Sequence, residues 1–420
     1  MREVDVLIIG AGIAGLGSAK KARDCNRDAV IFEARERAGG LLDNFMINGF
    51  RFDNAVHLSF AKEPEVRKIF DRTDYYTHPA DAQNFEEDKW LKHPVQNNLF
   101  PLPVDQKIEL IKSFIDRPSD IQGDDYESWL RHQYGDAISE RYPIGYTEKY
   151  WGTPASELST SWIGNRMRRA SIDEILFGAF SAVTPNTYYT KEMRYPKKGG
   201  YRSFINPLIT ESTIEYNYEA CAIDLEKKIV TFLNGKKVKY LTLVSSMPLP
   251  LLVSITNVTS DNINLAAKTL TATSIDLISV GFNKPLIKDL WFYIYDKSIL
   301  ASRAYSPSVK SPDNVPPGCS SLQFEIYSRG TESKYQKADL IENVVNALGK
   351  MELATPDDIL FTHHKHLKYG NVIFDKGMEK QRDLVRNFFS SQDIFTIGRF
   401  GEWDYLWSNQ SFMSGFGIEL

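Results

Sequence analysis

The sequence predicts an α/β protein whose first domain is interrupted by two insertions, one helical and one of antiparallel β-sheet. Three observations lead to this prediction. An apolar strand near the N-terminus runs into a glycine-rich turn and then a helix. A stretch with helical periodicity follows from about residue 103. Short, turn-separated strand patterns return after residue 188 and end in a second compact strand that stops at a glycine.

The elements of the first domain follow from apolar runs and the glycines between them. Val4 to Ile9 predicts a buried strand, residues 13–21 a helix and residues 29–33 a second strand, a βαβ-like start. Asn48-Gly49 breaks an alternating run and predicts a β-hairpin. Residues 103–182 carry helical patterns with proline and glycine only at the joins, which predicts the helical insertion.

The later part of the chain is β-rich. Residues 214–225, 227–240 and 241–248 hold short strand patterns, and Asn234-Gly235 marks a second hairpin. Residues 274–374 hold further strand-like runs and one amphipathic helix, and residues 393–398 predict the last strand.

The composition is that of an ordinary globular protein. The chain has 420 residues, enough for two or three domains, with 42% hydrophobic and 25% charged residues. A net charge of −4 gives no overall basic surface, so we expect no nucleic-acid or membrane partner. The cysteines lack paired spacing, which disfavours disulfides and a zinc site. Without a signal-peptide pattern or a long apolar run, we expect a cytoplasmic protein.

The glycine-rich turn has the pattern Gly10-x-Gly12-x-x-Gly15 between a strand and a helix. The first glycine permits the turn, the second lets a pyrophosphate approach the backbone, and the third lets helix and strand pack closely. Glu33 ends the second strand, where its carboxylate can accept hydrogen bonds from ribose hydroxyls. The turn therefore predicts a Rossmann-like dinucleotide site with the phosphates at the helix N-terminus.

A second glycine pair, Gly39-Gly40, follows Glu33. It resembles the extended fingerprint of FAD-binding proteins of the glutathione-reductase-like and amine-oxidase-like superfamily. The late segment from Ile397 to Gly401 resembles the return of the chain to the FAD-binding domain in that superfamily. The resemblance implies FAD as the cofactor. The cofactor-binding residues it implies are Gly10, Gly12, Ile13, Ala14, Gly15, Glu33, Ala34, Gly39, Gly40, Leu41, Gly398, Arg399, Tyr405, Asn409, Gln410 and Ser411.

These patterns divide the chain into six expected segments. Residues 1–75, 191–260 and 391–420 would form the Rossmann-like FAD-binding domain. Residues 76–102 and 261–390 would form a β-sheet domain that carries the substrate site, and residues 103–190 a helical domain.

Longer segments resemble the UDP-galactopyranose mutase family, and its eukaryotic-type branch more than the bacterial one. They are HPVQNN at 93–98, YTEKYWGTPASELSTSWIGNRM at 146–167, RYPKKGGYRSF at 194–204, LVSSMP at 243–248, WFYIYDKSILASRAYSP at 291–307 and GRFGEWDYLWSNQ at 398–410. The resemblance implies an isomerase that interconverts pyranose and furanose forms of UDP-galactose or a related sugar nucleotide. In that family the reduced flavin N5 bonds to the sugar C1 without net redox change. It also implies NADPH or NADH as the reductant.

By the same resemblance, Arg166 and Arg303 match two arginines that bind the diphosphate, and Tyr369 and Tyr405 match two phosphate-binding tyrosines. A guanidinium pairs bidentately with phosphate, and a phenol donates one hydrogen bond without adding charge. His57 matches the histidine loop beside the flavin. The residues expected to act in catalysis are therefore Arg166, Arg303 and His57.

The base and the sugar are less narrowly defined. The resemblance implies Gln96, Thr147, Trp151, Trp291 and Tyr293 as further substrate-binding residues. Thr147 stands where the eukaryotic-type proteins carry an asparagine, and Val95 where they carry an aromatic. The base is therefore left open between uridine and thymidine, and the sugar between galactose and a relative.

Two other functions stay open at this point. One is a flavin oxidase or dehydrogenase of the amine-oxidase or protoporphyrinogen-oxidase type, which shares the FAD-binding domain. The other is a flavin-binding protein without mutase activity. The two arginines and two tyrosines favour the mutase, because an oxidase of this type would not need these four residues to converge on an anion. His363, His364 and His366 lie close together, but no other ligand lies nearby in sequence, so we expect no metal there.

Overall fold

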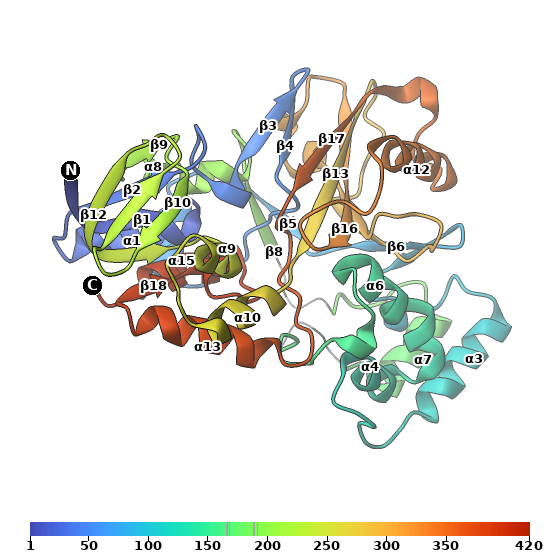
Figure 1. The fold of residues 1–420 in the computed structure, drawn as a ribbon. Helices are drawn as coiled ribbons and strands as arrows, with labels where there is room; N and C mark the ends of the chain where they lie inside the picture. The colour runs from blue at the N-terminus through green and yellow to red at the C-terminus, as the bar shows by residue number, and fades with distance from the viewer. Residues whose placement is uncertain (165–166, 168, 188–189, 191) are drawn as a thin grey trace.

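The computed structural model describes residues 1–164, 167, 169–187, 190 and 192–420. The chain forms three parts (Figure 1). The first is a sheet with its covering helices, and both chain ends lie there. The second is another sheet, and the third is a group of helices below the second sheet. This arrangement confirms the predicted α/β class with a Rossmann-like domain and additional antiparallel strands. The boundaries of the six expected segments stay predictions.

In the described part of the chain, the first sheet has the order β10-β11-β12-β1-β2-β9, and β18 pairs with the other end of β12. β1, β2, β9, β12 and β18 pair in parallel, and β10 and β11 are antiparallel. The strands are β1 Arg2–Ile9, β2 Ala29–Glu33, β9 Ile214–Tyr216, β10 Ala220–Asp224, β11 Ile229–Phe232, β12 Lys237–Ser245 and β18 Ile394–Thr396. Successive side chains of β1 enter different cores, which is why its sequence is apolar almost throughout.

The second sheet has the order β17-β13-β16-β15-β14-β6-β7, and β14 and β6 form its parallel pair. Its strands are β6 Gln83–Glu86, β7 Lys89–Lys92, β13 Thr273–Phe282, β14 Trp291–Ile294, β15 Arg303–Tyr305, β16 Ser320–Arg329 and β17 Ile359–Leu367. Two small antiparallel pairs complete the strands, namely β3 Asn44–Ile47 with β4 Phe50–Asp53, and β5 Tyr75–Pro79 with β8 Glu192–Pro196.

The helical part holds α3 Val104–Ile115, α4 Tyr126–Tyr134, α5 Asp136–Ser139, α6 Gly145–Trp151 and α7 Ile172–Phe180. Local capping explains two of their starts. Asp125 accepts the Ser128 N–H at the start of α4, and Ser171 and Glu174 form a reciprocal cap on α7.

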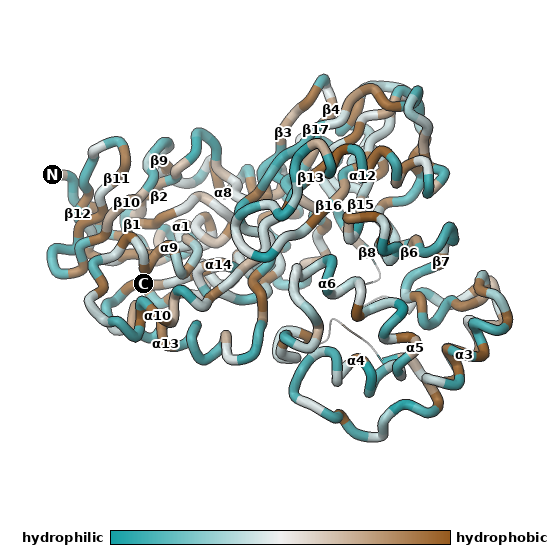
Figure 2. The backbone as a smooth tube through the Cα atoms, turned by 45° about the vertical axis from the view of Figure 1, so that its right-hand side comes forward, coloured by the Kyte–Doolittle hydropathy of each residue, from teal (hydrophilic) through white to brown (hydrophobic). Residues whose placement is uncertain are grey.

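The remaining helices cover the two sheets. They are α1 Ile13–Asp24, α2 Pro64–Phe70, α8 Asn206–Thr210, α9 Leu249–Ser254, α10 Asp261–Thr269, α11 Pro307–Lys310, α12 Lys337–Lys350, α13 Met378–Ser390, α14 Gly398–Gly401 and α15 Ser408–Phe416. Figure 2 shows the expected segregation, with brown stretches along β1 and β16 and a largely teal α13. Among the described helices, none is long and apolar enough to cross a membrane.

Two strand predictions need correction. Residues 214–225 are not one strand, because Asn217 has a φ of +60° and turns the chain from β9 at one edge of the first sheet to β10 at the other. Residues 237–245 form the single strand β12, where the sequence suggested a break near residue 241. Both predicted hairpins, at Asn48-Gly49 and Asn234-Gly235, are confirmed.

Two glycines let α15 pack directly on α1. A Cβ atom on Gly415 would lie 1.9 Å from the carbonyl oxygen of Ala14, and one on Gly17 would lie 2.6 Å from that of Phe412. The last turn of α15 thereby lies on the first turns of α1.

We expect Gly415→Ala to lower the free energy of unfolding by about 1–3 kcal/mol, because the added methyl group forces the two backbones apart. Urea denaturation of the purified variant measures this change. Gly349→Ala in α12 is the matched control, since a Cβ there meets no atom within 4 Å. Equal unfolding midpoints for the two variants would contradict the close packing of α1 and α15.

Candidate functional site

A cavity of about 1710 Å³ is lined by residues of both sheets and of α6. Its lining comes from the turn after β1, residues 39–42, 54–58 and 93–97, strands β14 and β15, and segments within 366–371 and 398–411. A single small ligand commonly occupies about 300–1,000 Å³. The cavity therefore has room for two ligands side by side.

The turn after β1 leaves an open position at Gly12. Gly10 has a φ of +96°, and a Cβ on Gly15 would lie 2.0 Å from the carbonyl oxygen of Gly10. A Cβ on Gly12, in contrast, would meet no atom within 4 Å. Gly12 also caps the N-terminus of α1, whose free N–H groups attract an anion. The open position is where the sequence predicts the pyrophosphate.

Glu33 is fixed at the end of β2 by backbone donors. Its Oε2 accepts the Ala11 N–H at 2.7 Å, and its Oε1 accepts the Arg35 N–H at 3.0 Å. The carboxylate is 8% exposed and lines the cavity. It is thus oriented toward the same space as the glycine turn.

Two later segments close on this turn. Gly39 and Gly40 have φ values of +130° and +57°, and a Cβ on Gly40 would lie 3.3 Å from the Cα of Gly12. Gly398, with a φ of +73°, comes so near to α1 that its Cβ would lie 2.6 Å from the Cβ of Ala14. Residues from the start and from the end of the chain therefore form this wall of the cavity together.

Arg399 follows Gly398 and binds neutral acceptors. Its guanidinium donates to the carbonyl oxygens of Leu406 and Gly370 and to Oδ1 of Asn371, at 2.7–3.3 Å. In the ranges that the structure describes, no carboxylate is paired with it. Arg399 therefore contributes an uncompensated positive charge to the cavity wall.

The start of α15 also lines the cavity, but two predicted cofactor residues are engaged within the protein. Asn409 donates from Nδ2 to Glu63 Oε1 at 2.8 Å. Gln410 accepts the Trp407 N–H at 2.9 Å, which caps the helix, and it does not line the cavity. Gln410 and Gly15 thus support the wall from behind, whereas Asn409 and Ser411 are part of it.

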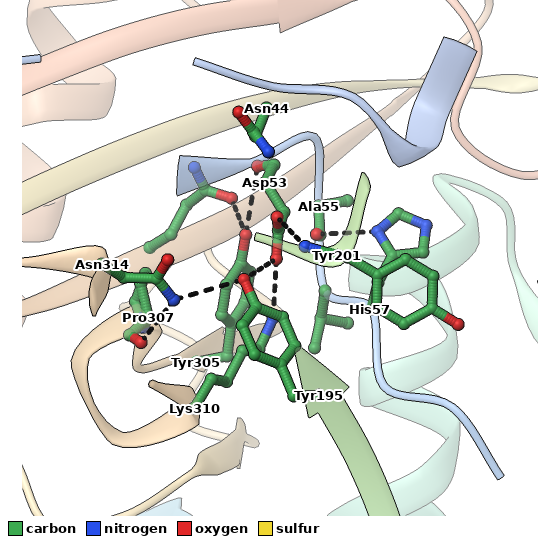
Figure 3. Close-up of polar contacts among 12 residues, drawn as sticks. Asn44, Asp53, Ala55, His57, Tyr195, Tyr201, Tyr305, Pro307, Lys310 and Asn314 are labelled. Carbon is green, nitrogen blue, oxygen red and sulfur yellow. Dashed lines mark hydrogen bonds and ion pairs between the residues drawn. The ribbon is translucent and has the colours of Figure 1, made fainter. Parts of the chain in front are cut away.

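His57 lies on the loop of residues 54–58, all of which line the cavity. Its Nδ1 lies 3.1 Å from the carbonyl oxygen of Ala55, so this nitrogen carries the proton, and its ring packs against Tyr201 at 5.2 Å (Figure 3). Loss of water around the ring, with Lys310 and Arg399 nearby, lowers the pKa of His57 to about 3. The imidazole is therefore neutral at physiological pH.

Arg303 on β15 reaches the cavity from the second sheet. Its Nε donates to Glu325 Oε2, and its Nη2 donates to the Tyr327 hydroxyl at 3.1 Å. The guanidinium lies over the Tyr150 ring at 5.2 Å. Although burial opposes it, the buried carboxylate of Glu325 raises the pKa of Arg303 above its ordinary value. Arg303 is thus a fixed cation with one edge held by a carboxylate.

Both predicted phosphate-binding tyrosines line the same cavity. The hydroxyls of Tyr405 and Tyr150 are 2.8 Å apart, and the Tyr405 ring packs on Trp151 at 5.3 Å. Tyr369 packs against Phe400 at 5.5 Å. Burial raises the pKa of Tyr369 and of Tyr405, so both phenols keep their protons as neutral donors.

The predicted base-binding residues differ in how much of each side chain is available. Gln96 is half-buried on the single turn Val95–Asn97. Trp291 is 5% exposed and packs in a core cluster with Tyr305, while Tyr293 is half-buried beside it on β14. The Thr147 hydroxyl donates to the carbonyl oxygen of Pro143, just before α6, at 2.6 Å. The Thr147 hydroxyl hydrogen is therefore not available to a ligand in this arrangement.

The cavity brings together most of the predicted site. Its lining includes Gly10, Gly12, Ile13, Ala14, Glu33, Ala34, Gly39, Gly40, Leu41, His57, Gln96, Thr147, Trp151, Trp291, Tyr293, Arg303, Tyr369, Gly398, Arg399, Tyr405, Asn409 and Ser411. Arg166 lies outside the described residues.

Comparisons with known proteins agree with this geometry. Residues 8–73 match the model of the NAD(P)-binding Rossmann-like domain. A structure of reduced UDP-galactopyranose mutase is similar over 98% of this chain and 94% of its own, with 25% identity and a TM-score of 0.91. The chain has the fold of the FAD-dependent amine-oxidase-like superfamily. Cyclohexylamine oxidase from Brevibacterium oxydans IH-35A shares this fold at 14% identity and a TM-score of 0.68, over 99% of this chain and 97% of its own.

Curated relatives match over short segments. Protoporphyrinogen oxidase 2 of Arabidopsis thaliana is 29% identical over 110 residues, and amine oxidase B of Rattus norvegicus is 47% identical over 36 residues. These segments cover 26% and 9% of this chain, and 21% and 7% of those proteins. The superfamily and its dinucleotide-binding domain support FAD as the cofactor. The match to the eukaryotic-type branch stays a prediction.

Some residues of the cavity wall and of the groups behind it were not predicted from the sequence. Gln323, Glu325 and Tyr327 alternate with Leu322, Phe324 and Ile326 on the buried strand β16, so three polar side chains share one face. A charged residue at such a position indicates a buried partner. Tyr150 left no comparable signal, because it stands beside Trp151 in an ordinary amphipathic helix.

His364 and His366 share the buried carboxylate of Asp276. His364 Nε2 and His366 Nδ1 lie 2.7 and 2.9 Å from its Oδ1, and His366 Nε2 lies 2.8 Å from the Thr331 carbonyl oxygen. Both partners of His366 are oxygen atoms that favour the protonated ring. Burial lowers the pKa of His366, but the hydrogen bonds with the Thr331 carbonyl and with Asp276 outweigh this effect and raise it. Within the described ranges, no group of metal-ligating residues was found.

Proposed function

We propose that this chain is a flavin-dependent nucleotide-sugar mutase that interconverts pyranose and furanose forms of UDP-galactose or a related sugar nucleotide. The observation that carries the proposal is one cavity that joins a dinucleotide turn to an anion site. Arg303, Arg399, Tyr369 and Tyr405 all line it. A sugar diphosphate needs such cations and phenol donors. An amine or porphyrinogen substrate has no diphosphate to bind.

Arg303 is held with one edge available for phosphate. Glu325 and Tyr327 engage its Nε and Nη2, and among the described residues Nη1 has no hydrogen-bond partner. Glu325 offsets the charge of Arg303, and Arg399 adds a positive charge that no described carboxylate offsets. Together the two arginines match the charge of a diphosphate better than either one alone.

FAD fits the glycine turn, because Gly12 leaves an open position and the N-termini of α1 and α15 offer free N–H groups. The reduced flavin, when bound, supplies a nucleophilic ring nitrogen for the sugar C1. Arg303 and Arg399 stabilise the negative charge that develops on the departing diphosphate, and Tyr369 and Tyr405 donate hydrogen bonds to it. NADPH or NADH is the proposed reductant.

Gln96 is the proposed contact for the base. In the part of the chain that the structure describes, its amide makes no hydrogen bond, so its donor and acceptor are available to the edge of a pyrimidine. Val95 is 2% exposed and packs in the core. Because the eukaryotic-type proteins carry an aromatic residue at this position, the site of this chain has one ring fewer. Uracil and thymine present the same hydrogen-bonding edge, and we propose UDP-sugars first and dTDP-sugars second.

The test is a conversion assay on the purified, FAD-loaded protein. Dithionite reduces the flavin, UDP-galactopyranose or UDP-galactofuranose is added, and the products are separated by anion exchange. We expect interconversion in the reduced sample and none in the oxidised control. The same assay with dTDP-sugars determines the base preference.

Two results would contradict the mutase. One is FAD binding without conversion of any UDP- or dTDP-sugar. The other is rapid oxygen consumption with an amine or porphyrinogen, which would favour the oxidase suggested by the short matches to curated oxidases.

A further inference from the structure

A charge pair lies wholly inside the protein behind the His57 loop. Lys310 Nζ is 3.4 Å from Asp53 Oδ2, and the two side chains are 0% and 1% exposed. The Tyr305 ring lies 3.9 Å from the same ammonium group. A buried ion pair is often no more stabilising than apolar residues of similar volume. Its presence therefore calls for another explanation than stability.

The pair connects directly to the cavity wall. Asp53 ends β4, and the next five residues form the loop 54–58. Its Oδ1 accepts the Tyr201 N–H at 3.1 Å, and its Oδ2 accepts the Tyr195 hydroxyl at 2.7 Å (Figure 3). The Tyr201 ring packs on His57, and its hydroxyl lies 2.9 Å from that of Ser408 at the start of α15. One carboxylate thus anchors both the loop and a neighbour of the helix N-terminus.

A second buried carboxylate holds the same loop. Glu325 accepts the Val56 N–H at 2.6 Å, and it also pairs with Arg303. The loop therefore runs between two ion pairs, one of which faces the cavity through Arg303. The Asp53–Lys310 pair does not line the cavity, so no ligand can screen it.

We propose that Asp53 and Lys310 are a positioning pair whose opposite charges balance one another along the loop 54–58, so that neither charge alone shifts the reduction potential of flavin bound beside His57. The inference rests on the proposed function, because it needs flavin in the cavity. Reduction adds negative charge to the flavin ring. A single uncompensated charge in a low-dielectric interior acts over several ångströms. A balanced pair keeps that influence small.

The charged and titratable groups around Lys310 come from every neighbouring element. Asp53 on β4, Tyr195 on β8 and Tyr305 on β15 touch the ammonium group, and Glu325 and Arg303 act on it electrostatically. The Lys310 carbonyl oxygen accepts a hydrogen bond from His78 Nε2 at 2.9 Å. The Lys310 ammonium group also contributes to the lowered pKa of His57. Burial lowers the pKa of Lys310 to about 8, although Asp53 opposes this effect.

The test measures the flavin midpoint potential of FAD-loaded wild type, Lys310→Met, Asp53→Asn and the double variant. Lys310→Met leaves a negative charge, so we expect a lower potential. Asp53→Asn leaves a positive charge, so we expect a higher one. Each single shift should change the ratio of reduced to oxidised flavin at least tenfold, about 30 mV for a two-electron couple. The double variant should return close to wild type.

Lys350→Met is the matched control for loss of a lysine charge. Lys350 pairs with Asp296 at 2.7 Å, and neither residue lines the cavity, so its potential should equal that of wild type. Single variants that shift in the same direction, or not at all, with FAD bound would overturn the inference. A merely structural role would weaken flavin binding in both variants without shifts of opposite sign.

If a single variant does not fold, the inference can still be tested by comparing wild type with the double variant. Their potentials are compared between pH 6 and 9.5. Above the Lys310 pKa the wild type keeps Asp53 without its cation, so its potential should fall below that of the double variant. Parallel curves would overturn the inference alone. A wild-type protein that binds no FAD would instead contradict the proposed function, and with it this inference.

Discussion

Arg303→Ala is expected to lower kcat/KM for the sugar nucleotide by about 10²–10³-fold while the flavin stays bound and reducible. The variant removes a cation that lines the cavity and whose Nη1 edge faces no protein partner among the described residues. Stopped conversion assays on the reduced enzyme measure the loss. Arg303→Lys keeps the charge without the planar fork, so an intermediate loss is expected.

The same substitution has a structural cost that must be separated from the catalytic one. Alanine leaves Glu325 buried with the Val56 N–H and the Tyr327 hydroxyl as donors and without its cation. The double variant Arg303→Ala, Glu325→Gln should therefore regain stability but not activity. Arg329→Ala is the control, because Arg329 pairs with Asp375 and does not line the cavity. Activity within fivefold of wild type in Arg303→Ala would contradict the anion site.

The parts of the fold that the sequence predicted well depend on local patterns. The glycine turn, Glu33 and Gly39-Gly40 are close in sequence, and each is required by backbone geometry at one turn. Both hairpins followed from an Asn-Gly pair. The position of β9 did not follow, because residues 214–225 give no sign that the chain crosses from one sheet edge to the other at Asn217.

The buried charges could not be predicted for a related reason. Arg303 meets Glu325 because β15 and β16 pair in that register, and Lys310 meets Asp53 because α11 packs on β4. The two members of each pair lie 22 and 257 residues apart in the chain. Nothing local connects them, so only the tertiary structure shows that both pairs hold the His57 loop.

Gly12→Val is expected to abolish FAD binding, with a loss of affinity of at least about 100-fold, while the cofactor-free protein keeps its stability. The backbone of Gly12 has a φ of −73°, which valine adopts without strain, and a Cβ there meets no protein atom within 4 Å. The added methyl groups would occupy the space predicted for the pyrophosphate. Titration of cofactor-free protein with FAD, followed by flavin fluorescence, measures the affinity.

Gly15→Val is the comparison variant for this test. Gly15 belongs to the same motif, but its substitution is expected to impair FAD binding by destabilising the fold and not by filling the pyrophosphate site. Its Cβ would lie 2.0 Å from the Gly10 carbonyl oxygen, so it destabilises the protein itself. A ligand that binds only the folded state raises the unfolding temperature of a protein that can bind it. FAD should therefore raise the Tm of wild type but not that of Gly12→Val, whose Tm without FAD equals that of wild type. Gly15→Val should have a lower Tm even without FAD. A Gly12→Val protein that binds FAD normally would show that the pyrophosphate does not lie at this turn, and the cofactor site would have to be sought elsewhere in the cavity.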